Sequence, residues 1–295
     1  MSSRRRNSSA RRVRLVSGFA GERGSTGGAI CLASDLTIDV QGSRFLHNAA
    51  LDGVAYSYGG AIALVGSLEA MDNRTSRVAT TNFDGNRAHG GPSAPGFGGG
   101  ISVRQAALVL GESVGFYGNV AKGHGRDDPS GGGAVYVAEF PAALLAEEAA
   151  EFVRNVAEGA TPNGGALFVT RSPKTVRLKG AKFDANMVRV LSGQGRGGAV
   201  SVDRGGDVHL EGCELHDNTA EMASFTARGA SGGAICVGNK GTAMLAVTKM
   251  WSNQAGGGAQ CLPLHHTDVT AHARLETRGG FILQTVSSTR PPASG

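Results

Sequence analysis

An alternation of hydrophobic and polar positions with a period of two recurs along the chain, each time after a pair of glycines. Two and four positions after the second glycine lie aliphatic residues, such as Ile30 and Leu32. The position between them varies from stretch to stretch, from Cys31 to Tyr136. Because successive side chains of a strand point to opposite faces, each stretch predicts a short strand with one buried face and one variable, outward face.

The signature Gly-Gly-small-aliphatic divides the chain into units of similar length. The steps between successive second glycines are 32, 39, 34, 32, 33, 35 and 25 residues, the last leading to a degraded copy, GGAQ, at 257–260. A fixed period of this kind is typical of stacked repeats that cannot bury an apolar face alone. The seven intact copies are GGAI (27–30 and 59–62), GGGI (98–101), GGAV (132–135), GGAL (164–167), GGAV (197–200) and GGAI (232–235).

A second signature, apolar-x-x-Asn-x-small, occurs once in each unit, as in FLHNAA (45–50). We expect the glycines to mark a corner where the backbone bends sharply or takes positive φ, and the asparagine to take the left-handed conformation at another corner. Stacked in register, the amides could bond to one another as a ladder. The ladder would contain Asn48, Asn86, Asn119, Asn155, Asn186, Asn218 and Asn253.

Each unit therefore predicts about three short strands separated by bends, and stacking such units at about 4.8 Å per coil gives a parallel β-helix. The predicted fold class is all-β: a single-stranded, right-handed parallel β-helix (β-solenoid) of about seven coils. A propeller would need four strands per unit, and a helical solenoid would need a period of 3.6. The segment PAALLAEEAAE (141–151) has helix-forming composition, so it predicts either a local helical turn or a strand overridden by context.

Composition agrees with one large ordered body. Hydrophobic residues make up 40% of the 295 residues, enough for a sizeable core, and the 47 glycines follow no Gly-x-y period, which excludes collagen. The predicted organisation is a disordered basic N-terminal arm (1–24), a β-helix domain with a degraded C-terminal cap (25–283) and a disordered tail (284–295).

The positive charge is concentrated at the N-terminus. The rest of the chain carries 22 basic and 23 acidic residues, so the repeat body has no basic footprint for nucleic acid. The arm is either a binding segment for an anionic polymer or a membrane, or a solvated tail. Its composition loosely fits a transit peptide, and no secretory signal is visible. No run of 18 apolar residues predicts a transmembrane segment. The arginines of the arm are Arg4, Arg5, Arg6, Arg11, Arg12, Arg14 and Arg23.

The paired signatures GGA[IVL] and FxxN resemble the repeats of the chlamydial polymorphic membrane proteins over roughly residues 25–260. The resemblance implies a β-helix like the passenger of an autotransporter, displayed outside the cell or on the outer membrane and acting in adhesion. The chain departs from that pattern at its N-terminus, where no export signal is recognisable.

One loop, GHGRDDPSGG, offers candidate catalytic residues: His124, Arg126, Asp127 and Asp128. Glycan hydrolases of the polygalacturonase type use paired aspartates, a Gly-His-Gly and a basic residue for acid and base chemistry on a glycosidic bond. Ordinary loop composition explains the same stretch. The sequence predicts no cofactor and no metal site.

Two further groups could bind a metal, or the first could cleave sugar, but each has a structural alternative. The first lies within one unit and is alternatively a solvated outer face: Asp203, Asp207, His209 and His216. The second is alternatively part of a capping segment: His265, His266, Asp268 and His272.

The four cysteines form no C-x-x-C pair, which argues against a zinc ribbon. Cys236 and Cys261 occupy the same outward offset in consecutive units, so their Cα atoms could lie about 5 Å apart. They are either a disulfide, if the protein is exported, or two reduced thiols.

The segments between each asparagine and the next glycine pair differ in length, as in 87–97, 120–130 and 219–231. They share one corner of the solenoid, and they either present a binding surface or reflect tolerated length drift. The predicted function is a non-enzymatic, adhesin-like scaffold that binds a protein or glycan partner through these loops. The alternatives are a polysaccharide lyase or glycoside hydrolase, and an internal fragment of a longer repeat protein.

Overall fold

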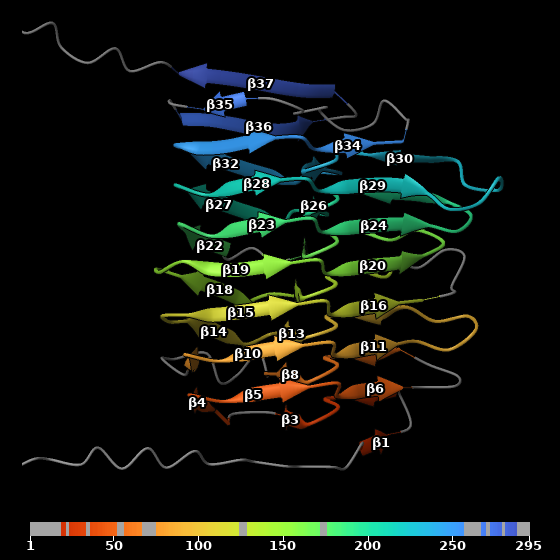
Figure 1. The fold of residues 1–295 in the computed structure, drawn as a ribbon, viewed down its shortest axis with the longest axis vertical. Helices are drawn as coiled ribbons and strands as arrows, with labels where there is room; N and C mark the ends of the chain where they lie inside the picture. Colours follow the sequence, from red (N-terminus) through yellow and green to blue (C-terminus); the bar gives the residue numbers. More distant parts are fainter. Residues whose placement is uncertain are drawn as a thin grey trace, which may run out of the picture.

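The structure is a computed structural model that describes residues 19–21, 24–33, 36–51, 56–66, 75–123, 129–171 and 176–256, and the backbone of three later strands. Within these ranges the chain forms strands, turns and bends and no helix. The strands stack in parallel as a β-solenoid of about six turns (Figure 1). The prediction of an all-β, stacked parallel fold is confirmed.

Each turn passes through sheets that we number 1 to 5 in chain order. Sheet 1 follows the paired glycines and contains β3 (Ile30–Ala33), β8 (Ile62–Val65), β13 (Ile101–Arg104), β17 (Val135–Ala138), β21 (Leu167–Thr170), β26 (Val200–Asp203) and β31 (Ile235–Val237). Sheet 2 carries the second alternation and contains β4 (Asp39–Gln41), β9 (Thr75–Ala79), β14 (Ala107–Leu110), β18 (Ala143–Ala146), β22 (Val176–Lys179), β27 (Asp207–Glu211) and β32 (Thr242–Ala246).

Sheets 3 and 4 lie on either side of the motif asparagine. Sheet 3 contains β5 (Arg44–Leu46), β10 (Asn82–Asp84), β15 (Val114–Tyr117), β19 (Ala150–Val153), β23 (Lys182–Asp184), β28 (Glu214–His216) and β33 (Thr248–Trp251). Sheet 4 contains β6 (Ala49–Leu51), β11 (Arg87–His89), β16 (Val120–Lys122), β20 (Val156–Gly159), β24 (Met187–Val190), β29 (Thr219–Met222) and β34 (Gln254–Ala255).

Sheet 5 returns the chain to the next glycine pair. It contains β2 (Gly24–Thr26), β7 (Ser57–Tyr58), β12 (Gly96–Phe97), β25 (Gln194–Arg196) and β30 (Gly229–Ser231), and single bridges at Gly131 and Asn163 continue the row. The sequence predicted about three strands per unit. The structure has more strands for two reasons. The chain bends at each asparagine, which separates sheets 3 and 4. In addition, most of the segments that the sequence predicts as loops contain residues that pair with the neighbouring turn and form sheet 5.

Equivalent residues of successive turns lie opposite one another in the sheets. Ile101 is the register partner of both Ile62 and Val135. The segment 141–151 follows the same rule and forms β18 and the start of β19, with Leu144 buried and Leu145 facing outward. Pairing with β14 and β22 therefore overrides its helix-forming composition.

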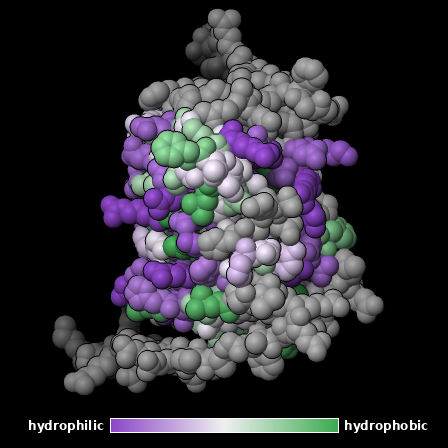
Figure 2. All heavy atoms as spheres, turned by 90° about the vertical axis from the view of Figure 1, so that its right-hand side faces the viewer, coloured by the Kyte–Doolittle hydropathy of each residue, from purple (hydrophilic) through white to green (hydrophobic). Residues whose placement is uncertain are grey.

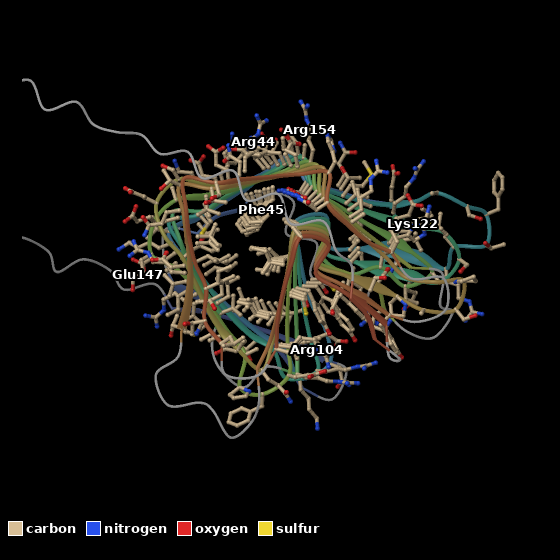
Figure 3. The ribbon with its side chains drawn as sticks, turned by 90° about the horizontal axis from the view of Figure 1, so that it is seen from below. Arg44, Phe45, Arg104, Lys122, Glu147 and Arg154 are labelled. Carbon is tan, nitrogen blue, oxygen red and sulfur yellow. The ribbon has the colours of Figure 1, made fainter. Side chains whose placement is uncertain are left out.

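Sheets 1, 2 and 3 enclose the main hydrophobic core. In the view along the solenoid, Phe45 points into this core and Arg44 points away from it (Figure 3). Successive phenylalanines of sheet 3 stack with ring centroids 4.7–5.0 Å apart, which is close to the spacing of paired strands. This stack contains Phe45, Phe83, Phe116, Phe152 and Phe183.

Sheets 4 and 5 and the loops between them form a smaller unit, which we call the minor lobe, around a second core that includes Val188 and Ala220. The second glycine of each pair lies at the waist between the two lobes. A Cβ on Gly133 would lie 2.6 Å from the backbone nitrogen and oxygen of Val156, so no larger residue fits. The first glycine meets a different requirement, because its φ is +62° to +69° in all seven pairs.

Antiparallel strands occur at both ends of the described chain. β36 (His272–Arg278) pairs with β32, β37 (Phe281–Ser287) pairs with β36, and β35 (Thr267–Val269) pairs with β33. β37 therefore extends beyond residue 283, the predicted end of the β-helix domain. At the other end, β1 (Phe19–Gly21), within the segment assigned to the basic arm, pairs with β2.

Candidate functional site

The seven motif asparagines lie in one line along the solenoid. Each of the first six donates from Nδ2 to Oδ1 of the asparagine one turn later, at 2.9–3.0 Å. Inside the row the amide is fully used: Asn155 also donates to the carbonyl of Phe116 and accepts from the backbone nitrogen of Asn119, both at 3.0 Å. The asparagines inside the row therefore hold a corner of the fold together and have no hydrogen-bonding capacity left for a ligand.

The left-handed backbone at this corner belongs to the residue before each asparagine, so the prediction that the asparagine itself adopts it is wrong. These preceding residues have φ between +51° and +62°. The asparagine is required for its side chain, and its neighbour provides the bend. The neighbours are His47, Gly85, Gly118, Arg154, Ala185, Asp217 and Ser252.

Several predicted site residues lie outside the described part of the chain. The candidate catalytic residues His124, Arg126, Asp127 and Asp128 do so. So do Cys261, His265 and His266, and the side chains of Asp268 and His272.

Two described cysteines are free thiols, and a third is not. Cys31 is exposed and Cys213 is buried, and burial raises the pKa of Cys213 to about 11. Cys236 is disulfide-bonded, while its predicted partner Cys261 is outside the described residues. Cys236 is buried rather than outward-facing.

From β8 onward, the variable position of the glycine strands is buried, because sheet 5 covers it; only Cys31 in β3 is exposed at this position among the described residues. The angle between sheets 5 and 1 holds a row of aromatic rings, which we call the aromatic row. Tyr58 and Phe97 come from sheet 5, and Tyr136 and Phe168 come from sheet 1; successive ring centroids lie 5.3, 4.4 and 5.6 Å apart. Phe97, Tyr136 and Phe168 are buried, and the predicted outward face is therefore wrong at this position.

Large and small residues alternate between the two sheets of the aromatic row. Sheet 1 carries Ala63 and Ser102 on the two turns where sheet 5 supplies a ring. Sheet 5 has Gly131 and Asn163 on the two turns where sheet 1 supplies the ring. A Cβ on Gly131 would come within 2.7 Å of the ring of Phe168, so the small residues leave the space that the rings fill.

Arg104 packs against Tyr58, the first ring of the aromatic row. Its guanidinium carbon lies 4.5 Å from the ring centroid of Tyr58, and its Nη2 donates to Glu139 Oε1 at 2.8 Å. Burial raises the pKa of Tyr136 far above its ordinary value. The aromatic row is thus mainly packed interior, and it offers little open surface to a ligand.

The segments predicted to form one corner do lie together. Segments 87–97 and 219–231 each begin in sheet 4 and lead toward sheet 5, at the right-hand edge of Figure 1, and the described start of segment 120–130 forms β16 of sheet 4. On this edge, small apolar patches lie among hydrophilic residues (Figure 2). Along sheet 4 an ion-pair row runs through Lys122, Glu158, Arg189 and Glu221, with nitrogen–oxygen distances of 2.6, 3.8 and 3.4 Å.

The turn between β29 and β30 carries Phe225, whose side chain is fully exposed, and exposed Met222 precedes it. Hydrogen bonds connect this β29–β30 segment to the equivalent loop one coil earlier in the solenoid. Arg228 donates its backbone N–H to the carbonyl of Gly193 at 2.7 Å, and the Thr226 hydroxyl donates to the carbonyl of Leu191 at 3.0 Å. The structure therefore presents an aromatic side chain from an anchored turn.

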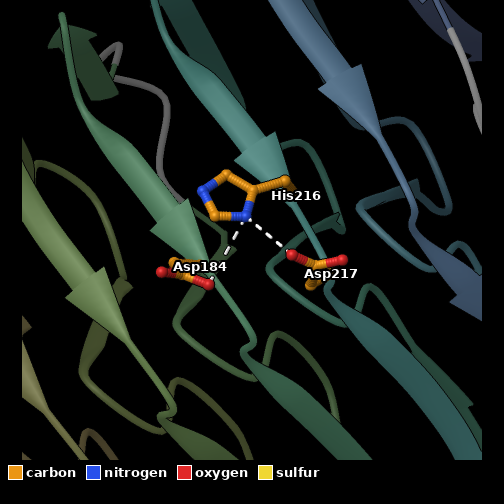
Figure 4. Close-up of side chains that lie close together, drawn as sticks. All are labelled: Asp184, His216 and Asp217. Carbon is orange, nitrogen blue, oxygen red and sulfur yellow. Dashed lines mark hydrogen bonds and ion pairs between the residues drawn. The ribbon is translucent and has the colours of Figure 1, made fainter.

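On sheet 3 the fold brings together Asp184, His216 and Asp217 (Figure 4). His216 Nδ1 lies 3.0 Å from Asp217 Oδ2 and 3.4 Å from Asp184 Oδ1. The sequence had grouped His216 with Asp203, Asp207 and His209 of its own unit instead.

Those three residues lie on other sheets. Asp207 and His209 form a separate pair on sheet 2, with 3.6 Å between Oδ2 and Nε2. Asp203 is on sheet 1, buried, with its Oδ2 3.8 Å from Arg204 Nε. The predicted four-residue cluster is therefore not assembled.

Comparison of the chain with protein-family models, curated proteins and solved structures finds no match. A function is therefore proposed from the geometry of the fold and from its exposed residues.

Proposed function

We propose that this chain is a non-enzymatic, surface-displayed or secreted β-solenoid scaffold that binds a protein partner through the loops of the minor lobe. Two findings support a scaffold of this kind: the regular stack of strands, and the resemblance of its GGA[IVL] and FxxN repeats to autotransporter passengers of the polymorphic membrane protein type. None of the described residues lies in a helix long and apolar enough to cross a bilayer.

The observation that carries the proposal is the exposure of Phe225 on an anchored turn. An aromatic side chain that is fully hydrated in the free protein gains free energy when a partner buries it, and aromatic residues are enriched among binding hot spots. The hydrogen bonds of Thr226 and Arg228 fix the turn beforehand, which lowers the entropy lost on binding.

The chemistry of the turn favours a protein over a glycan. Phe225 and Met222 offer an apolar pair whose natural complement is an apolar pocket. The neighbouring charges on sheet 4 already pair with one another, as Glu221 does with Arg189 at 3.4 Å. We therefore expect the apolar pair to supply most of the affinity and the ion-pair row to form part of a polar rim.

The test uses the intact chain and the variant Phe225→Ser to probe a phage-displayed peptide library and a glycan array. We expect peptides selected on the wild type to bind Phe225→Ser at least about tenfold more weakly, the loss typical of a hot-spot residue. Phe45→Leu, a substitution of a main-core residue, is a matched control that should leave binding unchanged.

Three outcomes would overturn the proposal. One is a set of selected peptides that bind Phe225→Ser as well as the wild type. Another is binding to glycans alone, which would assign the loops to carbohydrate. The last is turnover of acidic polysaccharides that disappears in Asp127→Ala, which would make the chain an enzyme.

A further inference from the structure

Three potential metal ligands from two successive turns converge on the outer face of sheet 3. Asp184 ends β23, and His216 is its register partner at the end of β28. Asp217 follows His216 directly and has a φ of +55°. In a straight strand, consecutive side chains point to opposite faces, but the left-handed bend brings Asp217 Oδ2 to 3.0 Å from His216 Nδ1.

The separations of the donor atoms suit a small divalent ion. Around an ion with bonds of 2.0–2.2 Å, neighbouring donor atoms lie about 3.0–3.5 Å apart. His216 Nδ1 lies 3.0 Å and 3.4 Å from its two carboxylate oxygens, and the three donor atoms are all within 4.8 Å of one another. An ion between them would leave its remaining coordination positions open to solvent.

The surroundings hold the ligands in place. Lys182 Nζ lies 3.4 Å from Asp184 Oδ2, the oxygen that does not face His216, so it orients the carboxylate and leaves Oδ1 available. The imidazole of His216 stacks on the indole of Trp251 from the next turn, with ring centroids 4.6 Å apart and planes 15° apart. Support of this kind around first ligands raises metal affinity.

We propose that Asp184, His216 and Asp217 form a binding site for a divalent transition-metal ion of the Zn²⁺ class. One imidazole nitrogen and two carboxylate oxygens suit Zn²⁺ and Ni²⁺ better than Ca²⁺, which takes six to eight oxygen ligands. The site lies on sheet 3 and depends on none of the loop residues of the minor lobe.

The chain's only tryptophan supplies the readout, because Trp251 stacks on the ligand His216. We would titrate the full-length protein with Ni²⁺, a paramagnetic ion that quenches nearby indole fluorescence. Saturable quenching is expected, reversed by excess Zn²⁺ and not produced by Ca²⁺. Calorimetric titration with Zn²⁺ should give a matching stoichiometry for this site.

Variants separate this site from other histidines and acids. His216→Gln and Asp217→Asn should each weaken quenching by Ni²⁺ about tenfold or more. Asparagine tolerates the left-handed backbone at 217, so Asp217→Asn should preserve the fold. Asp207→Asn, which alters the separate aspartate–histidine pair on sheet 2, should leave quenching unchanged. Quenching that is absent, or that persists equally in Asp217→Asn and His216→Gln, would overturn the proposal.

Discussion

One amide side chain per turn satisfies several buried backbone and side-chain groups at the corner between sheets 3 and 4. Asn155 accepts hydrogen bonds from the backbone nitrogen and Nδ2 of Asn119, and it donates to Asn186 Oδ1 and to the carbonyl of Phe116. Glutamine is too long for this geometry and aspartate lacks the donor, so the position is restricted to asparagine. This explains why the residue recurs when its neighbours vary.

Asn155→Ala should lower the free energy of unfolding by about 3 kcal/mol, because it leaves buried donors and an acceptor of Asn119 and Phe116 without partners. Asn48→Ala should cost only about 1 kcal/mol, since Asn48 is half-buried and ends the row. Urea denaturation of both variants measures the difference. Equal losses would show that the row does not act as a buried network.

At the scale of the element, the aromatic row joins the minor lobe to the main body. Sheet 5 alone is a narrow sheet, and its rings Tyr58 and Phe97 pack against those of sheet 1, Tyr136 and Phe168. The ring of Tyr136 therefore contributes to stability through its contact with another sheet as well as through its own burial.

A double-mutant cycle on Phe97→Ala and Tyr136→Ala tests this coupling. Each single variant should lose about 3 kcal/mol, as expected for deleting a buried aromatic ring, and the pair should show a coupling of about 1 kcal/mol. Phe225→Ala, which removes a fully exposed ring, is the control and should change stability by less than about 0.5 kcal/mol. The measurement is the free energy of unfolding, and additive losses would contradict direct ring contact.

The stack of strands could be predicted from the sequence because its positions are constant from turn to turn. The paired glycines, the aliphatic alternation and the motif asparagines each obey the same local requirement in every unit. The aromatic row could not be predicted in this way, because sheet 5 supplies the ring at Phe97 and sheet 1 supplies it one turn later at Tyr136. Neither position of the repeat is therefore aromatic in every turn. The register of the repeats does indicate the pair at His216, because Asp184 and His216 hold the same position of the asparagine motif in successive units; grouping residues within one unit overlooks it.

For the whole molecule, each turn contacts mainly the turns before and after it, so the solenoid is modular along its axis. The continuous phenylalanine stack and the asparagine ladder depend on the register between turns rather than on a particular turn. Removing one complete turn therefore keeps equivalent residues of the remaining turns in register. Removing part of a turn shifts every residue that follows out of register with the turn before it.

Deletion of residues 135–166 joins Ala134 to Leu167 and removes one full turn, because Val135 and Leu167 are register partners. This variant should remain folded, with β-type circular dichroism and a cooperative but lower thermal transition. Deletion of residues 135–150, about half a turn, should prevent folding because it places outward positions in the core. Failure of both variants, or folding of both, would contradict the modular description.

The asparagine ladder gives the two ends of the solenoid different hydrogen-bonding characters. Each bond of the ladder runs from Nδ2 of one turn to Oδ1 of the next, while the second Nδ2–H of the asparagines inside it donates back to a phenylalanine carbonyl of the preceding turn. Within the described residues, no earlier turn donates to Asn48 Oδ1. A further turn paired beneath β5 would continue the ladder only if it brought an amide N–H to Asn48 Oδ1 and a backbone carbonyl to Asn48 Nδ2. The ladder thus has a fixed direction along the solenoid, and growth at this end requires the same asparagine in the added turn.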